Sequence, residues 1–474
     1  MSNDWSILPG VDLHLDLASS GSRRASLERA LRDAIRSGRL APHTRLPSTR
    51  TLAAELGLAR GTVAAAYDQL VAEGFLTART GSGTTVAALA HSAPPSTRRM
   101  SEPAAPRFDL RPGSPDVSLF PVNDWLRSLR RALARVPVAA YDYGDPCGHI
   151  ELRRALAEYL GRARGVLAAP DRIVVTSGSV QALALLARVI AESGEPVIAM
   201  EDPGLAYHRE VVCHAGAQVT ALPVDDRGAR TDLLSTSEFS EVRAVVVTPA
   251  HQYPVGVTLH PQRRLALTAW ARERGGIVIE DDYDGEFRYD RQPVGALQGM
   301  APEHVAYLGS ASKTVAPGLR LAWLVLPEHL VQPVARAKRL TDLHTETIGQ
   351  LALAEFITSH GYDRHIRACR SRYRRRRDLL VARFGATFGR QYALHGIAAG
   401  LHGMVTLPPE GPTEAEVLAA ASARGLAVGE LGSHWHEPGE HHRQAIIVGY
   451  GTSGDASFAA ALDTLVRTLR GRAG

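Results

Sequence analysis

A stretch rich in proline, alanine and serine interrupts the chain at residues 87–107 (AALAHSAPPSTRRMSEPAAPR). It has no apolar periodicity, and its composition is typical of a stiff, partly extended linker. The stretch separates a head, residues 1–86, from a body, residues 108–474. These lengths fit one small domain and one large α/β unit, so we expect two parts that fold separately.

The head has the pattern of three helices and a hairpin. Apolar residues recur at helical spacing in 26–40, and Ser48 can cap a second helix that ends at Gly57. A third helix is expected over about 60–73. Residues 75–86 then alternate around a Gly-Ser-Gly turn, as a two-stranded wing does. The head is therefore predicted to be a mostly α winged helix-turn-helix domain.

A helix-turn-helix places its recognition helix in the major groove of DNA, because an α-helix fits the width of that groove. Side chains at the helix starts and in the wing then contact phosphates or base edges. The residues expected to do so are Arg45, Ser48, Arg50, Arg60, Thr62, Arg79 and Gly81. The alternative is a helical dimerisation cap with an ordinary solvated basic face. A net charge of +5 does not decide between the two, since many basic enzymes never bind nucleic acid.

In the body, short segments rich in β-branched residues alternate with helical stretches. Five of them are predicted as buried parallel strands: 172–176, 196–200, 243–249, 276–281 and 321–326. Such alternation is typical of a doubly wound α/β fold with a mostly parallel sheet. Ligands bind such sheets at the carboxyl ends of the strands, so polar residues after these segments are candidates for a site.

Two of these segments are followed by residues with distinct chemistry. Gly178 and Ser179 begin a helix after the first segment, and backbone amides at a helix N-terminus bind phosphate. Asp281 ends the fourth segment, and its carboxylate can pair with a ring nitrogen of a bound ligand. Tyr283 can donate a hydrogen bond to a phenolic oxygen of such a ligand. Either feature alone is common in proteins that bind no such ligand.

A lysine-containing loop, GSASKTVAPGLR, places Lys313 thirty residues after Tyr283. Ser310, Ser312 and Arg320 flank the lysine and can bind a phosphate. An amine, a carboxylate, a phenol donor and a phosphate cradle are what pyridoxal 5'-phosphate (PLP) requires of a protein. For each residue alone, a structural or solvated role is more common. The joint order and spacing of the set predicts a PLP site with a Schiff base on Lys313.

Both parts of the chain also resemble known families. Residues 46–84 are similar to the winged-helix heads of GntR-family regulators. The body resembles a fold-type I aminotransferase, and nearly the whole chain resembles a MocR-type regulator, through the strings at 111–125, 143–153, 201–204, 248–256, 280–290 and 310–323. The resemblance implies PLP on Lys313, with Asp281 and Tyr283 in contact with its ring. It also implies a head-to-tail homodimer in which Tyr143 reaches the partner's phosphate.

Two departures from the aminotransferase pattern bear on function. Tyr253 stands where aminotransferases usually carry an asparagine that bonds the phenolic oxygen, and His251 or Gln252 is the candidate substitute. MocR-type regulators commonly have this form, which favours sensing over turnover. Leu205 stands where the family often has a tyrosine over the ring, and Tyr207 is the alternative two positions on.

A third departure concerns the arginine that binds the substrate carboxylate in aminotransferases. Ile447 stands at the matching position, and Arg443 is the candidate replacement. Without such an arginine, PLP itself is the expected effector, as in a PdxR-like regulator of vitamin B6 synthesis or salvage. Two alternatives stay open. One is a sensor of an amino-acid-like effector that forms an external aldimine, and the other is an active aminotransferase with an accessory DNA-binding head.

Several features exclude other classes of protein or site. The three cysteines lie far apart, which predicts neither disulfides nor a thiolate metal site. The loop HWHEPGEHH (434–442) is expected to lie at the surface without a metal. The arginine-rich stretch 362–380 is expected to be a helix with a solvated face, and a second phosphate-contacting surface is the alternative. No signal peptide or membrane span is evident, so we expect a soluble cytoplasmic regulator. Its expected partners are PLP, a second copy and double-stranded DNA with repeated half-sites.

Overall fold

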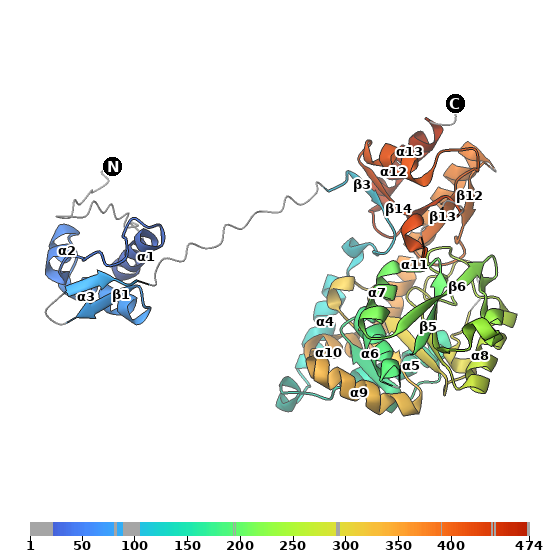
Figure 1. The fold of residues 1–474 in the computed structure, drawn as a ribbon, viewed down its shortest axis with the longest axis horizontal. Helices are drawn as coiled ribbons and strands as arrows, with labels where there is room; N and C mark the ends of the chain where they lie inside the picture. Colours follow the sequence, from blue (N-terminus) through green and yellow to red (C-terminus); the bar gives the residue numbers. More distant parts are fainter. Residues whose placement is uncertain are drawn as a thin grey trace. The chain divides into compact units, whose positions relative to one another are not determined.

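The structure, a computed structural model, describes residues 22–79, 83–88, 105–192, 194, 196–290, 294–389, 391–437, 439 and 442–471. These residues fall into two units, one within 1–104 and one within 105–474 (Figure 1). Most of the predicted linker lies outside the described residues. Its limits, and those of the head and body, therefore stay predictions.

The head is a three-helix unit with a two-stranded wing. Its elements are α1 (Arg23–Arg36), α2 (Thr49–Glu55), α3 (Arg60–Ala72), β1 (Leu76–Arg79) and β2 (Gly83–Val86). The predicted cap is present, because Ser48 Oγ accepts a hydrogen bond from the Thr51 amide at 3.1 Å. The strands pair antiparallel, with Leu76 opposite Val86, and both side chains are buried with those of the helices. The three helices and the wing were each predicted.

An eight-stranded sheet forms the centre of the body. Its order is β4-β11-β10-β9-β8-β5-β6-β7. The strands are β4 (Ile173–Thr176), β5 (Val197–Asp202), β6 (Gln218–Asp225), β7 (Gly228–Ala229), β8 (Val242–Val247), β9 (Ile277–Asp281), β10 (Val305–Ser310) and β11 (Ala322–Val325). Strands β6, β5, β8, β9 and β10 run parallel to their neighbours in this series. The mostly parallel sheet expected of a doubly wound fold is therefore present.

The prediction that 321–326 forms a parallel strand was wrong. Strand β11 is antiparallel to both β10 and β4, and Ser310 pairs directly with Ala322. A parallel pair needs a crossover connection, usually a helix, to return the chain to the starting edge. Residues 311–321 form no such helix and fold back at the same edge of the sheet, so the strand direction reverses.

Helices cover both faces of this sheet. On one face, alternate strand residues such as Val174 and Leu324 pack with α6 (Ser179–Ala191) and α9 (Glu328–Asp342). On the other face, Val175 and Trp323 pack with α5 (Ile150–Arg164) and α10 (Thr347–Thr358). Further helices are α4 (Val122–Leu133), α7 (Ala206–His214) and α8 (Pro261–Arg274). Burial on both faces explains why the strand segments are almost wholly apolar.

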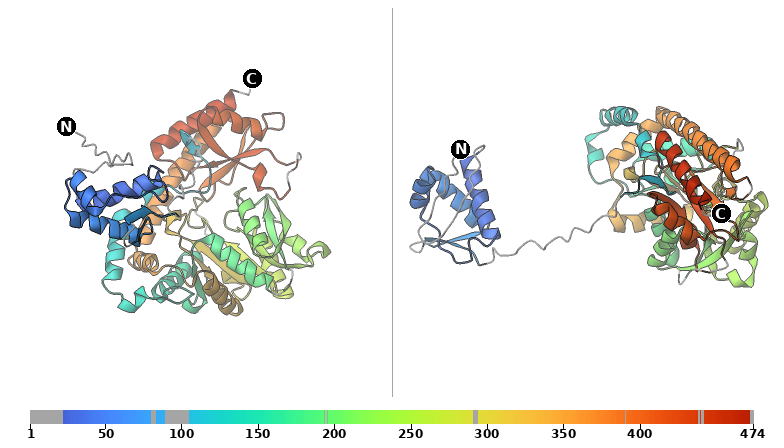
Figure 2. Two further views of the ribbon diagram at one scale, coloured as in Figure 1. Left: turned by 60° about the vertical axis from the view of Figure 1, so that its left-hand side comes forward. Right: turned by 90° about the horizontal axis from the view of Figure 1, so that it is seen from above.

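A smaller sheet lies at one end of the body, with its own helices (Figures 1 and 2). The strand order is β12-β13-β15-β14-β3. The strands are β3 (Phe108–Leu110), β12 (Ala393–His395), β13 (His402–Thr406), β14 (Leu426–Glu430) and β15 (Ala445–Gly449). Packed against it are α11 (Gly361–Phe388), α12 (Glu414–Ser422) and α13 (Asp455–Arg470). Among the described residues, none of the helices has the length and apolar character needed to span a membrane.

Candidate functional site

A cavity of about 270 Å³ lies at the carboxyl ends of the parallel strands. It is the place where an α/β sheet of this kind holds its ligands. Seven of the predicted cofactor residues line it: Ser179, Asp281, Tyr283, Ser310, Ser312, Lys313 and Arg320. They come from the start of α6, the end of β9 and the β10–β11 loop, which the fold brings together from segments far apart in the sequence.

Lys313 lies on the loop that joins β10 and β11, and its amine reaches into the cavity. Its Nζ donates a hydrogen bond to the carbonyl oxygen of Gly113. Burial lowers the pKa of the Lys313 amine, although the carboxylates of Asp284 and Asp281 act in the opposite direction. A lowered pKa increases the fraction of neutral amine, which is the form that attacks an aldehyde.

Lys313 is also chemically distinct within this chain, because the sequence contains one other lysine, Lys338. The Nζ of Lys338 is fully buried and lies 2.9 Å from both carboxylate oxygens of Asp342. It further donates to the side chain of Gln181 at 3.2 Å. Lys338 is thus held in an ion pair, and Lys313 is the lysine that faces the cavity.

Asp281, at the end of β9, is the acid at the base of this cavity. Burial, followed by the charge of Asp282, raises its pKa to about 7, while Lys313 acts to lower it. The Nδ1 of His208 lies 3.9 Å from Asp281 Oδ2. Burial lowers the pKa of His208 to about 4, so this histidine is neutral near pH 7 and does not neutralise the acid. Asp281 is therefore ready to pair with a cationic nitrogen of a ligand.

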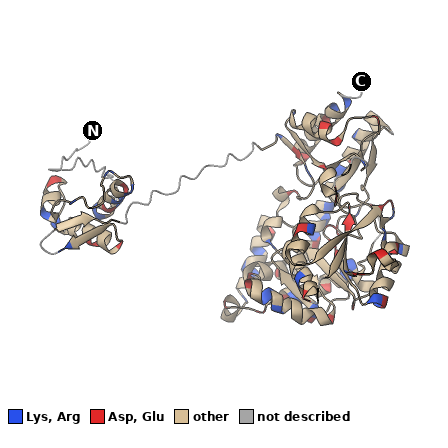
Figure 3. Cartoon of the chain, in the orientation of Figure 1, with Lys and Arg blue, Asp and Glu red and all other residues tan. Residues whose placement is uncertain are grey.

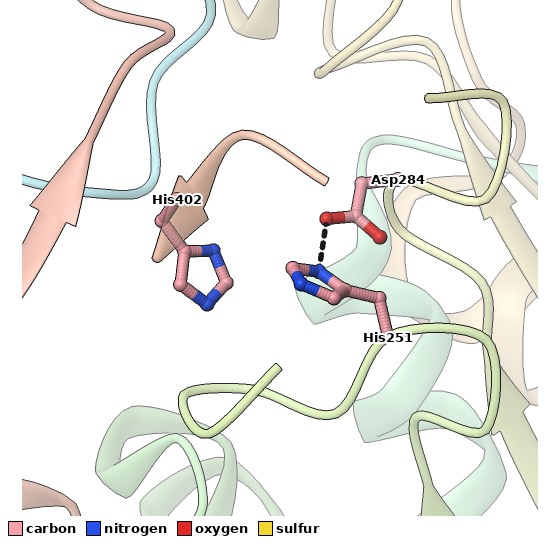
Figure 4. Close-up of side chains that lie close together, drawn as sticks. All are labelled: His251, Asp284 and His402. Carbon is pink, nitrogen blue, oxygen red and sulfur yellow. Dashed lines mark hydrogen bonds and ion pairs between the residues drawn. The ribbon is translucent and has the colours of Figure 1, made fainter. Parts of the chain in front are cut away.

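Tyr283 contacts His251, which in turn contacts Asp284; Figure 4 shows the His251–Asp284 pair. The Nδ1 of His251 lies 3.0 Å from the Tyr283 hydroxyl and 2.9 Å from Asp284 Oδ2. Its Nε2 lies 2.9 Å from the carbonyl oxygen of Gly396, so this nitrogen carries a proton and donates it. Burial and the charge of Asp284 hold the pKa of Tyr283 well above its usual value. Tyr283 thus remains a phenol that can donate to a ligand oxygen.

His251 itself does not line the cavity but forms a buried cluster with Asp284 and His402. Figure 4 shows the two imidazole rings beside each other, and their centroids lie 4.8 Å apart. By distance alone the three residues could coordinate a metal ion. However, both nitrogens of His251 have partners, and Nε2 of His402 lies 3.2 Å from the Pro254 carbonyl. Hydrogen bonding therefore accounts for the cluster.

The start of α6 and Arg320 form a cradle suited to an anion. Gly178 is the N-cap of α6, where free backbone amides point outward. Arg320 Nη2 donates to the carbonyl oxygen of Ser177 at 2.7 Å, which holds the guanidinium against this turn. The side chains of Ser310 and Ser312 lie in the same cavity. Amides, hydroxyls and a guanidinium together are the donors that a phosphate requires.

Besides Gly178 and His251, two more of the predicted cofactor residues, Tyr143 and Tyr207, do not line the cavity. Tyr143 is 82% exposed and packs edge-on against His344. Tyr207 is 55% exposed, on the outer side of α7. Leu205 and His208 line the cavity instead, because residues three apart share a face as the chain enters a helix. The suggestion that Tyr207 covers a ligand ring is therefore not supported.

Arg209, which was not among the predicted carboxylate-binding residues, lines the cavity. Its Nη1 donates to the carbonyl oxygens of Gly204 and His434, and its Nη2 to that of Trp435. The predicted replacement, Arg443, is exposed and does not line the cavity, and Ile447 is buried in β15. The i, i+3, i+4 spacing of residues 205, 208 and 209 was the signal that could have identified Arg209.

In the head, the predicted DNA-contacting residues lie at the starts of α2 and α3 and on the wing. Arg45, Ser48, Arg50, Arg60 and Arg79 are exposed, and Thr62 is half-buried in the first turn of α3. Residue Arg45 also forms an isolated bridge with Thr85 of the wing. Gly81 lies outside the described residues. The exposed guanidinium groups are available to bind phosphates.

Comparison with known proteins identifies both units. Residues 23–86 match the model for bacterial regulatory proteins of the gntR family, and residues 110–421 match that for aminotransferase class I and II. A probable rhizopine catabolism regulatory protein, MocR of Rhizobium meliloti, is 34% identical over 391 residues, which cover 78% of each chain. The chain belongs to the MocR-type regulators of the GntR family.

One further relative and one solved structure are similar to this MocR-type regulator. The pyridoxine biosynthesis transcriptional regulator PdxR of Corynebacterium glutamicum is 32% identical over 432 residues, covering 90% of this chain and 91% of the relative. The crystal structure of Pyrococcus horikoshii kynurenine aminotransferase in complex with PMP superimposes with a TM-score of 0.70 at 27% identity. It covers 77% of this chain and 91% of that protein. The regulator thus joins a GntR head to a body of the aminotransferase fold.

Proposed function

We propose that this MocR-type regulator binds PLP in the cavity of its body and that PLP occupancy changes how the head binds DNA. The observation that carries the proposal is the convergence of Lys313, Asp281 and Tyr283 on one cavity that Arg320 and the start of α6 also line. When bound, PLP supplies an aldehyde that condenses with the lysine amine. The chain's own residues would orient it.

The residues fit the four parts of such a ligand. The α6 N-terminus, Ser310, Ser312 and Arg320 would hold the phosphate, and Asp281 would pair with the protonated ring nitrogen. Pairing with that cation would favour the carboxylate form of Asp281, whose pKa is about 7 without it. Tyr283, kept as a phenol by its surroundings, would donate to the phenolic oxygen. Leu205 and His208 are the cavity residues positioned to cover the ring.

The genes of vitamin B6 synthesis or salvage are the proposed targets. Support comes from the PdxR relative, whose printed name refers to pyridoxine biosynthesis. An effector can shift DNA binding only if it has different affinities for the two states of the protein. We propose a head-to-tail homodimer in which Tyr143 approaches the partner's site. Its two heads would bind an operator with repeated half-sites, and the protein would act in the cytoplasm.

The test uses purified full-length protein and DNA fragments upstream of B6-synthesis or salvage genes in the source genome. We expect PLP to generate a visible absorbance band and to change the apparent Kd for one of these fragments several-fold. Pyridoxine, which lacks both the phosphate and the aldehyde, should change neither. Binding that is indifferent to PLP, or no binding to any such fragment, would contradict the proposal.

A second candidate is a sensor of a carboxylate-bearing amine, and Arg209 is the observation that favours it. Its guanidinium faces the cavity although three carbonyls hold it. A bidentate contact with a carboxylate is the usual work of an arginine in such a position. In the PLP-loaded protein, an effector of this class would shift the absorbance band and alter DNA affinity, and Arg209→Gln would abolish both effects.

The third candidate, an active aminotransferase, is favoured by the fold of the solved relatives. We propose that turnover is absent, because the relatives that span most of the chain are named as transcriptional regulators. Multiple turnovers with any amino acid and oxo acid pair would establish the enzyme. A single half-reaction would remain compatible with a sensor.

A further inference from the structure

The arginine-rich helix α11 has two different faces. On one face, Arg376 is 3% exposed in its side chain and forms ion pairs with Asp116 at 2.6 Å and Asp455 at 2.7 Å. Arg372 also pairs with Asp455, and Arg383 pairs with Asp463. These arginines hold the helix to other parts of the body. The expectation that 362–380 is simply a solvated face is therefore wrong for this side.

The other face of α11 lines a pocket of about 700 Å³ at the surface of the body. Figure 3 shows Lys and Arg interspersed with Asp and Glu along the helices and strands of the body. In this pocket, in contrast, one sign of charge dominates. We call it the arginine pocket, after its six arginines: Arg162, Arg164, Arg288, Arg367, Arg370 and Arg374. Its acidic lining residues are Glu286 and Asp363.

Three of the six arginines are matched by carboxylates. Arg162 pairs with Asp363 at 2.9 Å, Arg164 with Asp282 at 2.7 Å, and Arg288 with Asp290 at 2.5 Å. The charges of these three arginines are therefore balanced by carboxylates of the protein itself. Glu286 is buried, and burial together with Asp282 raises its pKa to about 7, so it supplies at most a partial negative charge.

The three arginines from α11 are not matched in this way. Within the described parts of the chain, no carboxylate lies within ion-pair distance of Arg367, Arg370 or Arg374. Arg370 donates its Nε to the backbone carbonyl of Glu286 at 2.8 Å. The Nε of Arg374 is buried without a hydrogen-bond partner. Guanidinium groups gathered in this manner repel one another and are stabilised by an anion.

The three unmatched arginines lie along the helix rather than around a point. Residues 367, 370 and 374 share one face of α11 and span about 10 Å at 1.5 Å per residue. One small dianion is best held by donors that converge on it. A row of cations matches a row of phosphates, such as those along one strand of DNA.

We propose that the arginine pocket binds the sugar-phosphate backbone of DNA that flanks the site read by the head. The proposal rests on the DNA-binding function proposed above and adds a second, sequence-independent contact through the body. Arginine contacts to phosphate carry no base preference, but they add affinity that falls as salt rises. The body would then contribute to operator binding only when the DNA extends beyond the head's own footprint.

The experiment compares full-length Arg367→Gln/Arg374→Gln with a control that loses two charges elsewhere, Arg243→Gln/Arg274→Gln. Both control arginines are exposed and lie outside the arginine pocket. Each protein is titrated, at several salt concentrations, with a fragment cut at the edges of the head's footprint and with one extended by several helical turns. Thermal melting and the PLP absorbance band verify that both variants are folded.

We expect the pocket variant to lose about tenfold in affinity for the extended fragment and to reduce the salt slope by about 1 to 2. Its affinity for the short fragment should stay within twofold of wild type, and the control should match wild type on both. Equal affinity and slope on the extended fragment would overturn the proposal. Failure of the wild-type protein to bind either fragment would overturn the DNA-binding function, and this inference with it.

A small anion is the competing occupant, and inorganic pyrophosphate is its probe. If pyrophosphate raised the melting temperature of wild type but not of Arg367→Gln/Arg374→Gln, while both bound the extended fragment equally, the pocket would be a small-anion site. The DNA proposal would then be wrong. We expect instead that pyrophosphate competes with the extended fragment more than with the short one.

Discussion

The guanidinium of Arg320 fills the space that a side chain on Gly178 would need. A Cβ atom at position 178 would lie 2.2 Å from Arg320 Nη2 and 2.6 Å from Cζ. Gly178 also has φ +104°, a conformation that residues with a side chain rarely adopt. The loop before α6 and the loop after Lys313 are thus fitted to each other at this point.

Gly178→Ala should therefore displace Arg320 and weaken PLP binding by about tenfold or more, the equivalent of about 1.4 kcal/mol. The measurement is an absorbance titration with PLP. Gly275→Ala is the matched control, because Gly275 has φ +64° but nothing within 4 Å of its would-be Cβ. The control should lose about 1 kcal/mol of stability and keep its PLP affinity. Equal PLP affinities in both variants would contradict the cradle.

The low lysine content makes the anchor directly testable. Borohydride reduction of the PLP-loaded protein should fix the cofactor on the peptide that contains Lys313 and leave Lys338 unmodified, since Lys338 is buried in its ion pair. Mass spectrometry of the digest reads out the site. Lys313→Arg keeps the positive charge but cannot form the bond, so it should show neither the adduct nor the visible band. An adduct on Lys338 would refute the assignment.

Asp281→Asn should change stability in a pH-dependent manner. A carboxyl whose pKa rises on folding, here from about 4 to about 7, stabilises the fold at low pH and loses that contribution as the pH rises through 7. Without PLP, the melting temperature of the variant relative to wild type should therefore increase by roughly 2 to 6 °C between pH 5 and pH 8. Asp226→Asn, an exposed change, should show no such trend.

The same variant should bind PLP more weakly, by about ten- to a hundredfold at pH 7.5, because an amide cannot neutralise the ring nitrogen. Titration by absorbance measures this loss. A variant with normal PLP affinity would show that Asp281 does not face the ring, and a melting difference that is constant with pH would show that folding does not raise the pKa of Asp281.

Two adjacent arginines on α11, one buried in ion pairs and one exposed, should contribute very differently to stability. Arg376→Met should lower the free energy of unfolding by about 3 to 5 kcal/mol, because it leaves the buried Asp116 without its partner. Arg375→Met should change it by less than about 0.5 kcal/mol, since Arg375 is exposed. Urea denaturation of both variants measures the difference. Similar stabilities would mean that the buried ion pair contributes little.

Local features of the fold and site were predictable from the sequence, and long-range ones were not. Ser48 was recognised as a cap because capping depends on the next three residues. Asp281 was identified because it ends a strand whose apolar pattern is unambiguous, and Lys313 because of its loop and its spacing from Tyr283. The direction of β11 was missed, because it depends on the path of the loop before it. The partner of Arg376, Asp116, is 260 positions away, and no local pattern indicates it.

Arg209 and Tyr207 show how one helix boundary affects the interpretation of a site. The helix α7 begins at Ala206, which turns Tyr207 outward and brings His208 and Arg209 to the cavity. An extended chain at the same residues would alternate and bring Tyr207 to the same side as Leu205. The choice between the two depends on packing against α6, which the sequence of this segment does not reveal.

The antiparallel pairing of β10 and β11 fixes both ends of the lysine loop to the core, with Ser310 opposite Ala322. A change in the position of either end of the loop would break hydrogen bonds between β10 and β11, so the backbone at Lys313 is held in a fixed position. His208 and Arg209 of α7 also line the cavity, and the 434–435 segment holds Arg209 through its backbone carbonyls. Preference for one small molecule over another can therefore drift among related proteins through those segments alone, while the covalent anchor stays unchanged.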